Sequence, residues 1–557
     1  MPGKRVYLET FGCQMNELDS ELVAGELSRL GYHFVPEASD AEVVLYNTCS
    51  VREQAEQKVW SRLGELNQRK QREPGLVVGV LGCMAERDGT DLMDRMPVVD
   101  VMCGPGELDK LPSLLDNAVR TSASMASDEP LPVPTIVKSA RQSALQGATS
   151  RRSATLSAAE DSLEMLDLSR AVSPVDSDVG SRSAYVRITR GCNKFCTYCV
   201  VPHTRGAEIH RPPEHIIEEC KRLADAGVIE ITLLGQTVNH YRFEHEAAVA
   251  VGGVVQPQKG RTYKGSHRRD AFSGERVTTF ADLLYEIHEQ VPAIKRLRFV
   301  TSYPRDFGDD VLEVMRDCER MCRYLHVPGQ SGSDRVLKMM NRGYTVAEYD
   351  EFVCRAREFL DQPEIGRPLM VSGDIIVGFP TETDEEYQQT VELVERSRYK
   401  NCFIFKYSPR PGTYAHKKIA DDVPDAVKRQ RNNHLLAVQA RICDEISREQ
   451  IGREFDVFVE GLSKRAKQAR GQSIGDIRRA GMTAITIGGN KLGGAIASGG
   501  AAAVAEAEGP VQLSGRTDGD QIVFFEADAE VAESMIGSIR RVRIERGERL
   551  SLFGELI

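Results

Sequence analysis

The stretch that decides the fold is residues 185–206, which read YVRITRGCNKFCTYCVVPHTRG. Its first four residues alternate in the manner of a strand. Cys192, Cys196 and Cys199 follow on one loop with the spacing C-x3-C-x2-C. Three thiolates spaced in this way can occupy three corners of a [4Fe–4S] cube and leave the fourth iron without a protein ligand. Because such an iron can bind a substrate, we interpret the loop as a reactive iron–sulfur site.

Two other interpretations of this loop are open. The thiols could bind zinc together with a fourth ligand, for which His203 is the nearest candidate, or they could be unrelated. The chain has 13 cysteines in 557 residues, and its N-terminus, MPGKRVYLETFGC, lacks the apolar stretch of a secretory signal. We therefore expect a cytoplasmic protein whose clustered cysteines are metal ligands. No apolar run approaches the ~20 residues that span a bilayer, so we expect no membrane association.

Outward from the loop, residues 183–440 are predicted to form one α/β domain. Strand candidates occur at 185–188, 229–234, 297–301, 324–327, 369–377 and 402–407, with helical stretches between them. Six such units predict an open or partial barrel of parallel strands, with its ligand site at their carboxyl ends. Residues 241–277 are rich in Gly, Lys and Arg, without a core-forming pattern, and we interpret them as a surface insertion.

Residues 1–120 predict a second parallel α/β domain, with strands at 5–8, 43–46, 76–81 and 99–102 and helices at 17–29 and 53–69. Cys13, Cys49 and Cys83 each lie just beyond one of these strands. Because the carboxyl ends of parallel strands share one edge of a sheet, we expect the three to converge on a shared metal site. Taken singly, each would more often be a buried structural cysteine. Cys103 fits a similar description and weakens the argument.

The rest of the chain divides into a linker and a tail. Residues 121–182 are rich in Ser, Ala, Pro and Asp and predict a linker or disordered insertion, with a helical turn near 162–168. Residues 445–557 have strand character, which indicates a small β-barrel. Within them, 466–509 is a Gly- and Ala-rich insertion.

These motifs resemble a known superfamily. C-x3-C-x2-C with an aromatic residue, Tyr198, before the last cysteine is similar to the radical S-adenosylmethionine (SAM) signature. With the N-terminal domain and the β-rich tail, the whole chain resembles the methylthiotransferases. The resemblance implies a [4Fe–4S] cluster that binds and cleaves SAM on the first three cysteines, and a second one on Cys13, Cys49 and Cys83 that delivers sulfur. It also implies that the tail is an RNA-binding TRAM domain.

Within that family the segments FGCQMNELDS, NTCSVRE, CVVPHTRG, LLGQTVNHY and QSGSDRVLKMMNRGYT resemble one branch most closely. It transfers a methylthio group to carbon 2 of N6-isopentenyladenosine at position 37 of tRNA. Branches acting on an aspartate of a ribosomal protein or on threonylcarbamoyl-adenosine remain alternatives, as does a non-catalytic RNA-binding iron–sulfur protein. The three insertions depart from the pattern without removing a proposed ligand.

Several polar residues follow strands of the central domain and could face the SAM site. With Tyr198, the candidates for cofactor binding are Gly235, Gln236, Asn239, Ser302, Gln330, Ser331 and Asp374. Surface or turn roles are the alternative for any one of them. Arg205 is a candidate to screen anionic groups near the cluster.

The formal net charge of −10 argues against indiscriminate nucleic-acid binding, but local basic patches could dock RNA. Candidates for contact with the tRNA anticodon stem-loop are Lys464, Arg465, Lys467, Arg470, Arg540, Arg541 and Arg543, with 259–269 and 428–431 as further basic stretches. Each run alone is more often a solvated face. We expect a monomer served by a separate electron donor and sulfur source.

Overall fold

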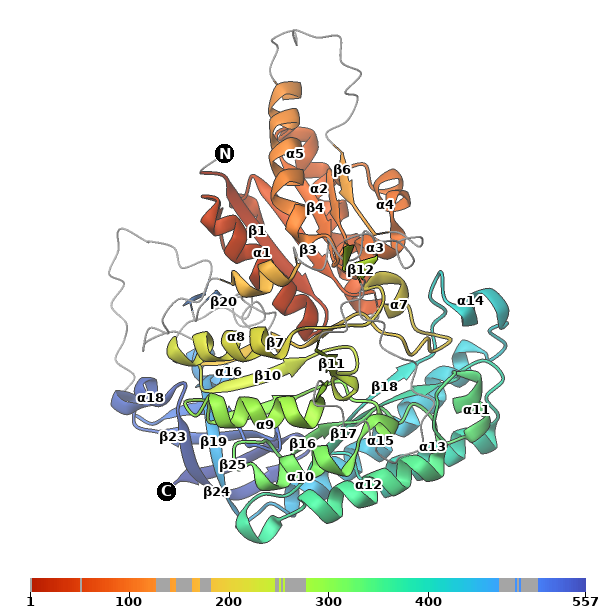
Figure 1. Cartoon of the computed structure of the whole chain (residues 1–557), viewed down its shortest axis with the longest axis vertical. Helices are drawn as coiled ribbons and strands as arrows, with labels where there is room; N and C mark the ends of the chain where they lie inside the picture. Colours follow the sequence, from red (N-terminus) through yellow and green to blue (C-terminus); the bar gives the residue numbers. More distant parts are fainter. Residues whose placement is uncertain are drawn as a thin grey trace.

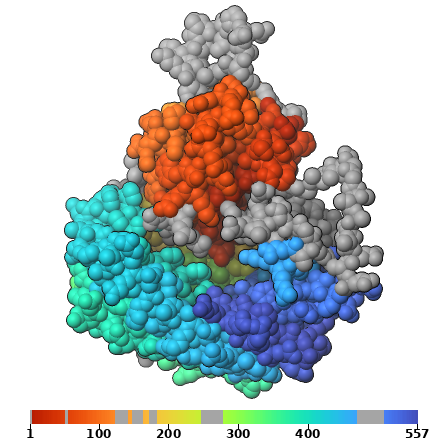
Figure 2. All heavy atoms as spheres, turned by 180° about the vertical axis from the view of Figure 1, so that it is seen from behind, coloured from red at the N-terminus to blue at the C-terminus, as the bar shows by residue number. Residues whose placement is uncertain are grey.

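The fold is described from a computed structural model of the chain. It describes residues 3–50, 53–126, 141–146, 163–170, 182–245, 250–251, 254–255, 277–469, 486–487, 490–491 and 509–557. The N-terminal domain lies above the central α/β domain, and the C-terminal barrel lies against the side of the latter (Figure 1). The same arrangement is visible from behind (Figure 2).

The N-terminal domain is a parallel sheet with helices on both faces. Its strands follow the order β2-β1-β3-β4-β5-β6. They are β1 (Arg5–Phe11), β2 (His33–Phe34), β3 (Val43–Thr48), β4 (Val77–Leu81), β5 (Val101–Cys103) and β6 (Gln142–Ala144). α1 (Gln14–Arg29) and α5 (Leu111–Ala126) pack on one face, and α2 (Glu53–Arg72), α3 (Cys83–Asp88) and α4 (Thr90–Arg95) on the other. Every residue of β3 and β4 is buried, as expected for a parallel sheet covered on both sides.

The four strands predicted in this domain are confirmed, and two more are present. β2 and β6 have only two and three residues. β6 comes from the interval 121–182, which the composition assigns to a linker, and pairs with β5 in parallel. Residues 163–168 of the same interval are helical, as expected. The helical piece packs into the hydrophobic core through Leu163 and Leu166, and β6 is a strand that the prediction of a linker does not include.

The central domain is the predicted partial barrel of six parallel strands. β7 (Ser183–Arg187), β10 (Glu230–Leu234) and β15 (Arg296–Phe299) form one sheet, and β16 (Tyr324–His326), β17 (Met370–Val377) and β18 (Asn401–Lys406) form the other. A parallel bridge between Leu297 and Met321 joins the two sheets. One hydrophobic core runs through both, so the six units form a single partial barrel.

Helices cover the outside of this barrel. They are α8 (Pro213–Asp225), α9 (Phe280–Gln290), α10 (Asp309–Asp317), α11 (Asp334–Met339), α12 (Val346–Leu360), α13 (Asp384–Ser397), α14 (Tyr414–Lys418) and α15 (Asp425–Arg448). The short helix α7 (Val201–Thr204) instead follows the cysteine loop and packs against α3 of the N-terminal domain. The short pair β8 (Thr189–Arg190) and β9 (Ile209–His210) flanks the cysteine loop. The insertion at 241–277 begins and ends in β11 (Arg242–Glu244) and β14 (Val277–Thr279), which pair antiparallel; most of it lies outside the described residues.

The tail is a closed five-stranded barrel, as predicted. Its order is β19-β22-β23-β25-β24, with β19 (Glu454–Leu462), β22 (Val511–Arg516), β23 (Ile522–Ala527), β24 (Ile539–Glu548) and β25 (Ser551–Leu556). In the sequence, three short elements come between β19 and β22: α16 (Lys464–Ala469), β20 (Thr486–Ile487) and β21 (Asn490–Lys491). α18 (Ala529–Met535) precedes β24. Residues of β22 alternate between buried and half-buried, which is the pattern of a strand with one face in a barrel core.

Buried ion pairs dock the barrel onto the central domain. Asp520 accepts from Lys400 at 2.7 Å and pairs with Arg298 at 2.9 Å. Arg516 donates to Glu230 at 2.7 Å, and the Glu230 side chain is 1% exposed. The two units therefore form one interlocked body. None of the described helices is both long enough and apolar enough to cross a membrane.

Candidate metal centres

The first cysteine loop lies beyond the carboxyl end of β7, between β8 and α7. Gly191 opens it with φ +67°, and a Cβ there would lie 1.9 Å from the carbonyl oxygen of Ala207, so the position requires glycine. Thr197 donates its backbone N–H to Met340 and accepts from the N–H of Ala415. The loop is thus held from several sides by the barrel's own elements.

The three thiols of this loop lie near one another and near a positive charge. Burial raises the pKa of Cys192 to about 11, and burial together with the thiols of Cys196 and Cys192 raises that of Cys199. Arg342 donates to the Cys196 sulfur at 3.3 Å, and its guanidinium packs on Tyr303. A buried thiolate cluster needs positive charge to form, and this site is arranged to accept a metal centre.

The second group of cysteines converges at one edge of the N-terminal sheet. Cys13 directly precedes α1, Cys49 directly follows β3, and Cys83 begins α3 after β4. Because β1, β3 and β4 are neighbours in parallel register, the three positions are adjacent. The convergence expected from the sequence is therefore present.

Burial, neighbouring thiols and a nearby arginine set the pKa values of these thiols. A hydrogen bond with Cys49 lowers the pKa of Cys13 to about 6 against the opposing effect of burial, with help from the charge of Arg205 and the amides that open α1. Burial raises the pKa of Cys83, and Arg205 again opposes it. Arg205 therefore lies beside this second group, whereas the sequence analysis assigns it to the first loop.

Two buried asparagines support the second group. Asn16 accepts from the Cys13 thiol at 3.3 Å and donates to Asn47 at 2.9 Å. Asn47 donates in return to the Asn16 carbonyl oxygen and to Ser20. Both asparagines stand within the quoted motifs GCQMN and NTCS, yet the sequence analysis does not single them out. The sequence pattern that could have identified these asparagines is a polar residue close to a cysteine at a strand end.

The donor set tests which metal fits. Each group offers three thiols, the ligands that hold [4Fe–4S] clusters, and three ligands would leave one iron open. Among the described residues, the one group of three ligand atoms that all lie within 4.8 Å of one another is Glu208, His210 and His240, so at least one pair of sulfurs in each triad is farther apart than that.

Cys103 does not belong to the second group. Its thiol donates to the carbonyl oxygen of Glu107 at 3.1 Å. Burial and the neighbouring carboxylates raise its pKa well above the ordinary value, and neither Cys13, Cys49 nor Cys83 contributes to that shift. It is a buried structural cysteine, which resolves the ambiguity left by the sequence.

Most residues proposed to face SAM lie beyond the carboxyl ends of barrel strands, whereas Asp374 lies within β17, and they differ in what they contact. Ser302 is 4% exposed and its hydroxyl has no hydrogen-bond partner among the described residues, so it is available to a ligand. Gly235 and half-buried Gln236 follow β10. Asn239 instead uses both ends of its amide on the backbone of Tyr303, at 2.8 and 2.9 Å. We interpret Asn239 as the residue that joins the loops after β10 and β15.

The remaining candidates surround the same mouth. Gln330 has φ +67° and pairs through its backbone with β17. Ser331 is buried and accepts from the N–H of Ser333. Asp374 contacts His326 at 3.3 Å. Tyr198 packs edge-on against Phe379 in a separate small core, which fixes the loop between the last two cysteines.

Charged residues connect the two centres. Asp19, on α1, accepts from Arg205 at 2.8 Å and from Arg187 of the central domain at 2.8 Å. Arg187 also donates to Asp167 at 2.7 Å, in the helical piece 163–168. A small cavity lies here, lined by Arg187 and Arg205 but by none of the six cysteines. The second centre nevertheless lies close to the first loop, because α3, which begins with Cys83, packs against α7, which begins two residues after Cys199.

The basic candidates for RNA contact are less uniform than the sequence suggests. Lys464 and Arg465 are exposed on α16, Lys467 is half-buried, and Arg470 lies outside the described residues. Arg541 and Arg543 form ion pairs with Glu454 of the neighbouring strand. Half-buried Arg540 lies on the same strand, β24. The positive charge of the β24 group is therefore partly compensated within the barrel.

An aromatic pair on the barrel surface offers another mode of contact. Phe524 and Phe553 stack with ring centroids 5.4 Å apart, and the Arg546 guanidinium lies 3.9 Å from the Phe553 ring centre. Both rings are half-buried, on the outward-facing positions of their strands. Aromatic and arginine planes of this kind stack on unpaired bases. The sequence analysis missed this pair because the two strands are neighbours in the barrel but are separated in the sequence.

Comparison with known proteins agrees with this geometry. Residues 186–394 match the family model of the radical SAM superfamily, and residues 5–104 match the model described as uncharacterized protein family UPF0004. The fold and the cysteine loop thus define a radical SAM enzyme.

The curated relatives make the assignment narrower. A tRNA-2-methylthio-N(6)-dimethylallyladenosine synthase of Rhodopirellula baltica is 43% identical over 84% of this chain and 85% of its own length. A synthase of the same description from Porphyromonas gingivalis is 33% identical over 100% of this chain and 95% of its own. The chain belongs to the tRNA-2-methylthio-N(6)-dimethylallyladenosine synthase family.

Proposed function

We propose that this protein transfers a methylthio group to carbon 2 of N6-dimethylallyladenosine (isopentenyladenosine) at position 37 of tRNA. The observation that carries the proposal is the contact between α3, which begins with Cys83, and α7, which directly follows the loop of the other three cysteines, so that two three-cysteine groups face the same domain junction. The family relationship supports the substrate. We propose that Cys192, Cys196 and Cys199 hold a [4Fe–4S] cluster that binds SAM, and that Cys13, Cys49 and Cys83 hold a second one.

The chemistry requires such a pair. The hydrogen on carbon 2 of an adenine is not acidic, so its removal calls for a radical, which a reduced cluster with bound SAM supplies. Sulfur must then arrive at the same carbon, which explains a second open iron on the facing domain. The chain's own residues hold the two centres in place, with Arg342 at the first and Arg205 at the second.

The tail is proposed to grip the anticodon stem-loop. Lys464, Arg465 and Lys467 would contact phosphates, and Phe524 with Phe553 would stack on an unpaired base. A base in the anticodon loop leaves its stack at little cost and can then reach the proposed SAM site. We propose that the enzyme works in the cytoplasm as a monomer and draws on a separate electron donor and sulfur source.

Nucleoside analysis of tRNA from cells lacking this gene tests the proposal. We expect the 2-methylthio nucleoside to disappear and its unthiolated precursor to accumulate. The wild-type gene should restore the product, and a Cys192→Ala gene should not. Cys354→Ala is the matched control because this thiol is exposed and distant from both centres in the sequence. Unchanged 2-methylthio nucleoside in the deletion strain would refute the substrate.

The two centres should be separable in the purified protein. Anaerobic reconstitution should give about eight iron atoms per chain, and changing Cys13, Cys49 and Cys83 together to Ala should leave about four. Reductive SAM cleavage should persist in this variant, and methylthio product should be lost. Loss of both activities in a protein still folded by circular dichroism would assign the N-terminal cysteines another role.

A further inference from the structure

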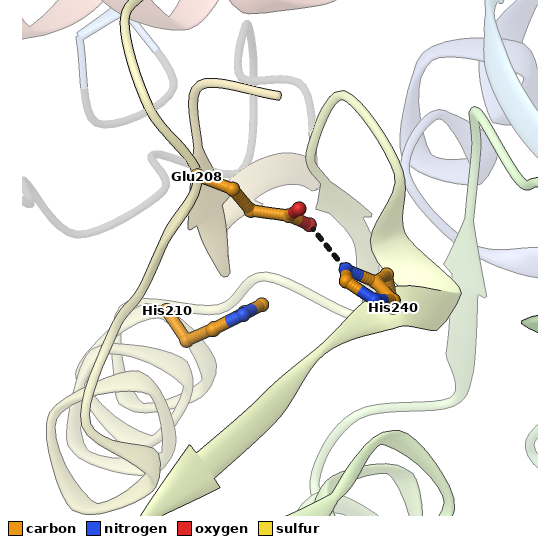
Figure 3. Close-up of side chains that lie close together, drawn as sticks. All are labelled: Glu208, His210 and His240. Atoms are coloured by element: carbon orange, nitrogen blue, oxygen red, sulfur yellow. Dashed lines mark hydrogen bonds and ion pairs between the residues drawn. The ribbon is translucent and has the colours of Figure 1, made fainter. Parts of the chain in front are cut away.

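A second type of ligand cluster lies close to the first cysteine loop. Glu208 directly precedes β9, His210 ends β9, and His240 ends the short helical turn η4 (Val238–His240) that follows β10. Each offers one ligand atom, and these atoms lie within 4.8 Å of one another. In Figure 3, Glu208 and His210, which belong to one segment of the chain, point toward His240, which belongs to another. The proposed function of the enzyme makes no use of these three residues.

The cluster is buried, and two of its polar atoms have no partner. The side chain of Glu208 is 1% exposed, and that of His240 is 14% exposed. One Glu208 oxygen lies 2.9 Å from His240 Nδ1. The other Glu208 oxygen and His210 Nδ1 are buried without a hydrogen-bond partner among the described residues. Leaving such atoms unsatisfied destabilises a fold, so a buried pair of them points to a missing ligand.

The charge of the cluster suits a cation. Burial alone would raise the pKa of Glu208, but chiefly the hydrogen bond with His240 holds it below its ordinary value. The site therefore presents an anionic oxygen. Burial also lowers the pKa of His210 to about 4, against the opposing pull of Glu208, so that its ring is neutral at pH 7 and has a free lone pair.

We propose that Glu208, His210 and His240 bind one divalent transition-metal ion of the zinc class. Two imidazoles and one carboxylate are a donor set that zinc takes readily, with bond lengths of about 2.0–2.2 Å and donors about 3.4 Å apart. The observed separations need only small side-chain movements to reach that geometry. A water molecule would complete a tetrahedral site. The ion is distinct from both cysteine centres because it uses nitrogen and oxygen donors alone.

The position of the site indicates a structural role. The Glu208 backbone N–H donates to the side chain of Asn193, which is the residue after Cys192. Val238, in the same turn as His240, donates its N–H to Thr301 beyond β15. An ion at this point would fasten the return from the cysteine loop to the loop after β10. It would therefore stabilise these two loops next to the proposed SAM site without contacting the substrate.

Zinc binding by the full-length, anaerobically reconstituted protein tests the proposal. The protein is equilibrated with one equivalent of ZnCl2 and desalted, and zinc is measured by mass spectrometry and by X-ray absorption at the zinc edge. His210→Phe keeps the ring packing on Tyr241, at 5.7 Å between centroids, but removes both nitrogens. His245→Phe is the matched control, since His245 also packs on an aromatic ring, Phe243, and lies outside the cluster. Glu208→Gln provides a second variant of nearly unchanged shape.

We expect about one zinc per wild-type chain, with nitrogen and oxygen neighbours only. His210→Phe and Glu208→Gln should each lower bound zinc at least tenfold and abolish the rise in melting temperature that zinc causes. His245→Phe should behave as wild type. Sulfur neighbours at the zinc edge, absence of zinc from the wild-type protein, or equal zinc in His210→Phe would overturn the proposal. An equal or higher melting temperature of His210→Phe with zinc present would do the same, because it would identify a simple unpaired nitrogen.

Discussion

Replacing Asp19 by Asn should loosen the junction between the two cysteine centres. The Asp19 carboxylate is 1% exposed and accepts from Arg187 and from Arg205, each at 2.8 Å. Asn keeps the shape and one acceptor but removes the charge. Arg187 retains Asp167 as a partner, whereas Asp19 is the one ion-pair partner that Arg205 has among the described residues. The substitution therefore leaves Arg205 charged and buried, with the neighbouring thiols of Cys13 and Cys83 in place of a carboxylate partner.

The magnitude follows from that burial. Removing one partner of a buried ion pair costs about 3–5 kcal/mol. At about 2–4 °C for each kcal/mol, the transition of the N-terminal domain should fall by roughly 6–20 °C. Calorimetry or circular dichroism at pH 7 measures this shift. Methylthio product should fall as well, because Arg205 lies beside Cys13 and Cys83.

Glu26→Gln, on the same helix, is the matched control for Asp19→Asn. Glu26 pairs with Arg29 at the surface, where an ion pair contributes about 0–1 kcal/mol. The melting temperature of the Glu26→Gln variant should differ from that of the wild type by no more than a few degrees. A loss below about 1 kcal/mol for Asp19→Asn, or an equal loss for both variants, would refute the buried-bridge argument.

Two further predictions concern other buried charges. Asp520→Asn should weaken docking of the barrel by about 3–5 kcal/mol and open the junction to proteolysis, whereas Asp528→Asn, which removes no ion pair among the described residues, should not. Burial alone would raise the pKa of Asp520, but its basic partners lower it, so its contribution is present above pH ~4 and is lost as the pH falls further. Arg342→Gln should lower the midpoint potential of the first cluster on the order of 100 mV, because a charge about 6 Å away contributes about 3 kcal/mol. Arg335→Gln, on the exposed face of α11, is its control in redox titration, and equal potentials would contradict this role.

Strong local patterns let the sequence predict most of the framework. The six barrel strands and four strands of the first domain, β1, β3, β4 and β5, lie in apolar runs bounded by helices, and the structure confirms them. β2 and β6 could not be predicted because neither lies in an apolar run and neither is buried, and pairing with neighbouring strands specifies them instead. Asp167 lies in a stretch whose composition indicates a linker, yet it is buried against Arg187. Composition averages over a segment and does not register one such anchor.

The functional sites also contain some features that the sequence predicts and others that it does not. The positions of Cys13, Cys49 and Cys83 relative to strands sufficed to predict their convergence, since parallel topology brings strand ends together. Side-chain partners could not be predicted, because they depend on contacts between distant segments. Asn239 therefore joins two loops where a ligand contact was expected. The cluster of Glu208, His210 and His240 went unnoticed because His240 lies about thirty residues after the other two, and no known metal-ligand spacing links the three.

The most direct test offers substrates to the purified, reduced enzyme with SAM. One tRNA carries isopentenyladenosine at position 37, a second carries plain adenosine there, and the ribosomal protein that is the alternative substrate is the third. We expect the 2-methylthio product chiefly on the first tRNA, with binding that weakens steeply as salt rises because phosphate contacts release counterions. Modification of an aspartate in the ribosomal protein, with the isopentenylated tRNA untouched, would contradict the proposed function.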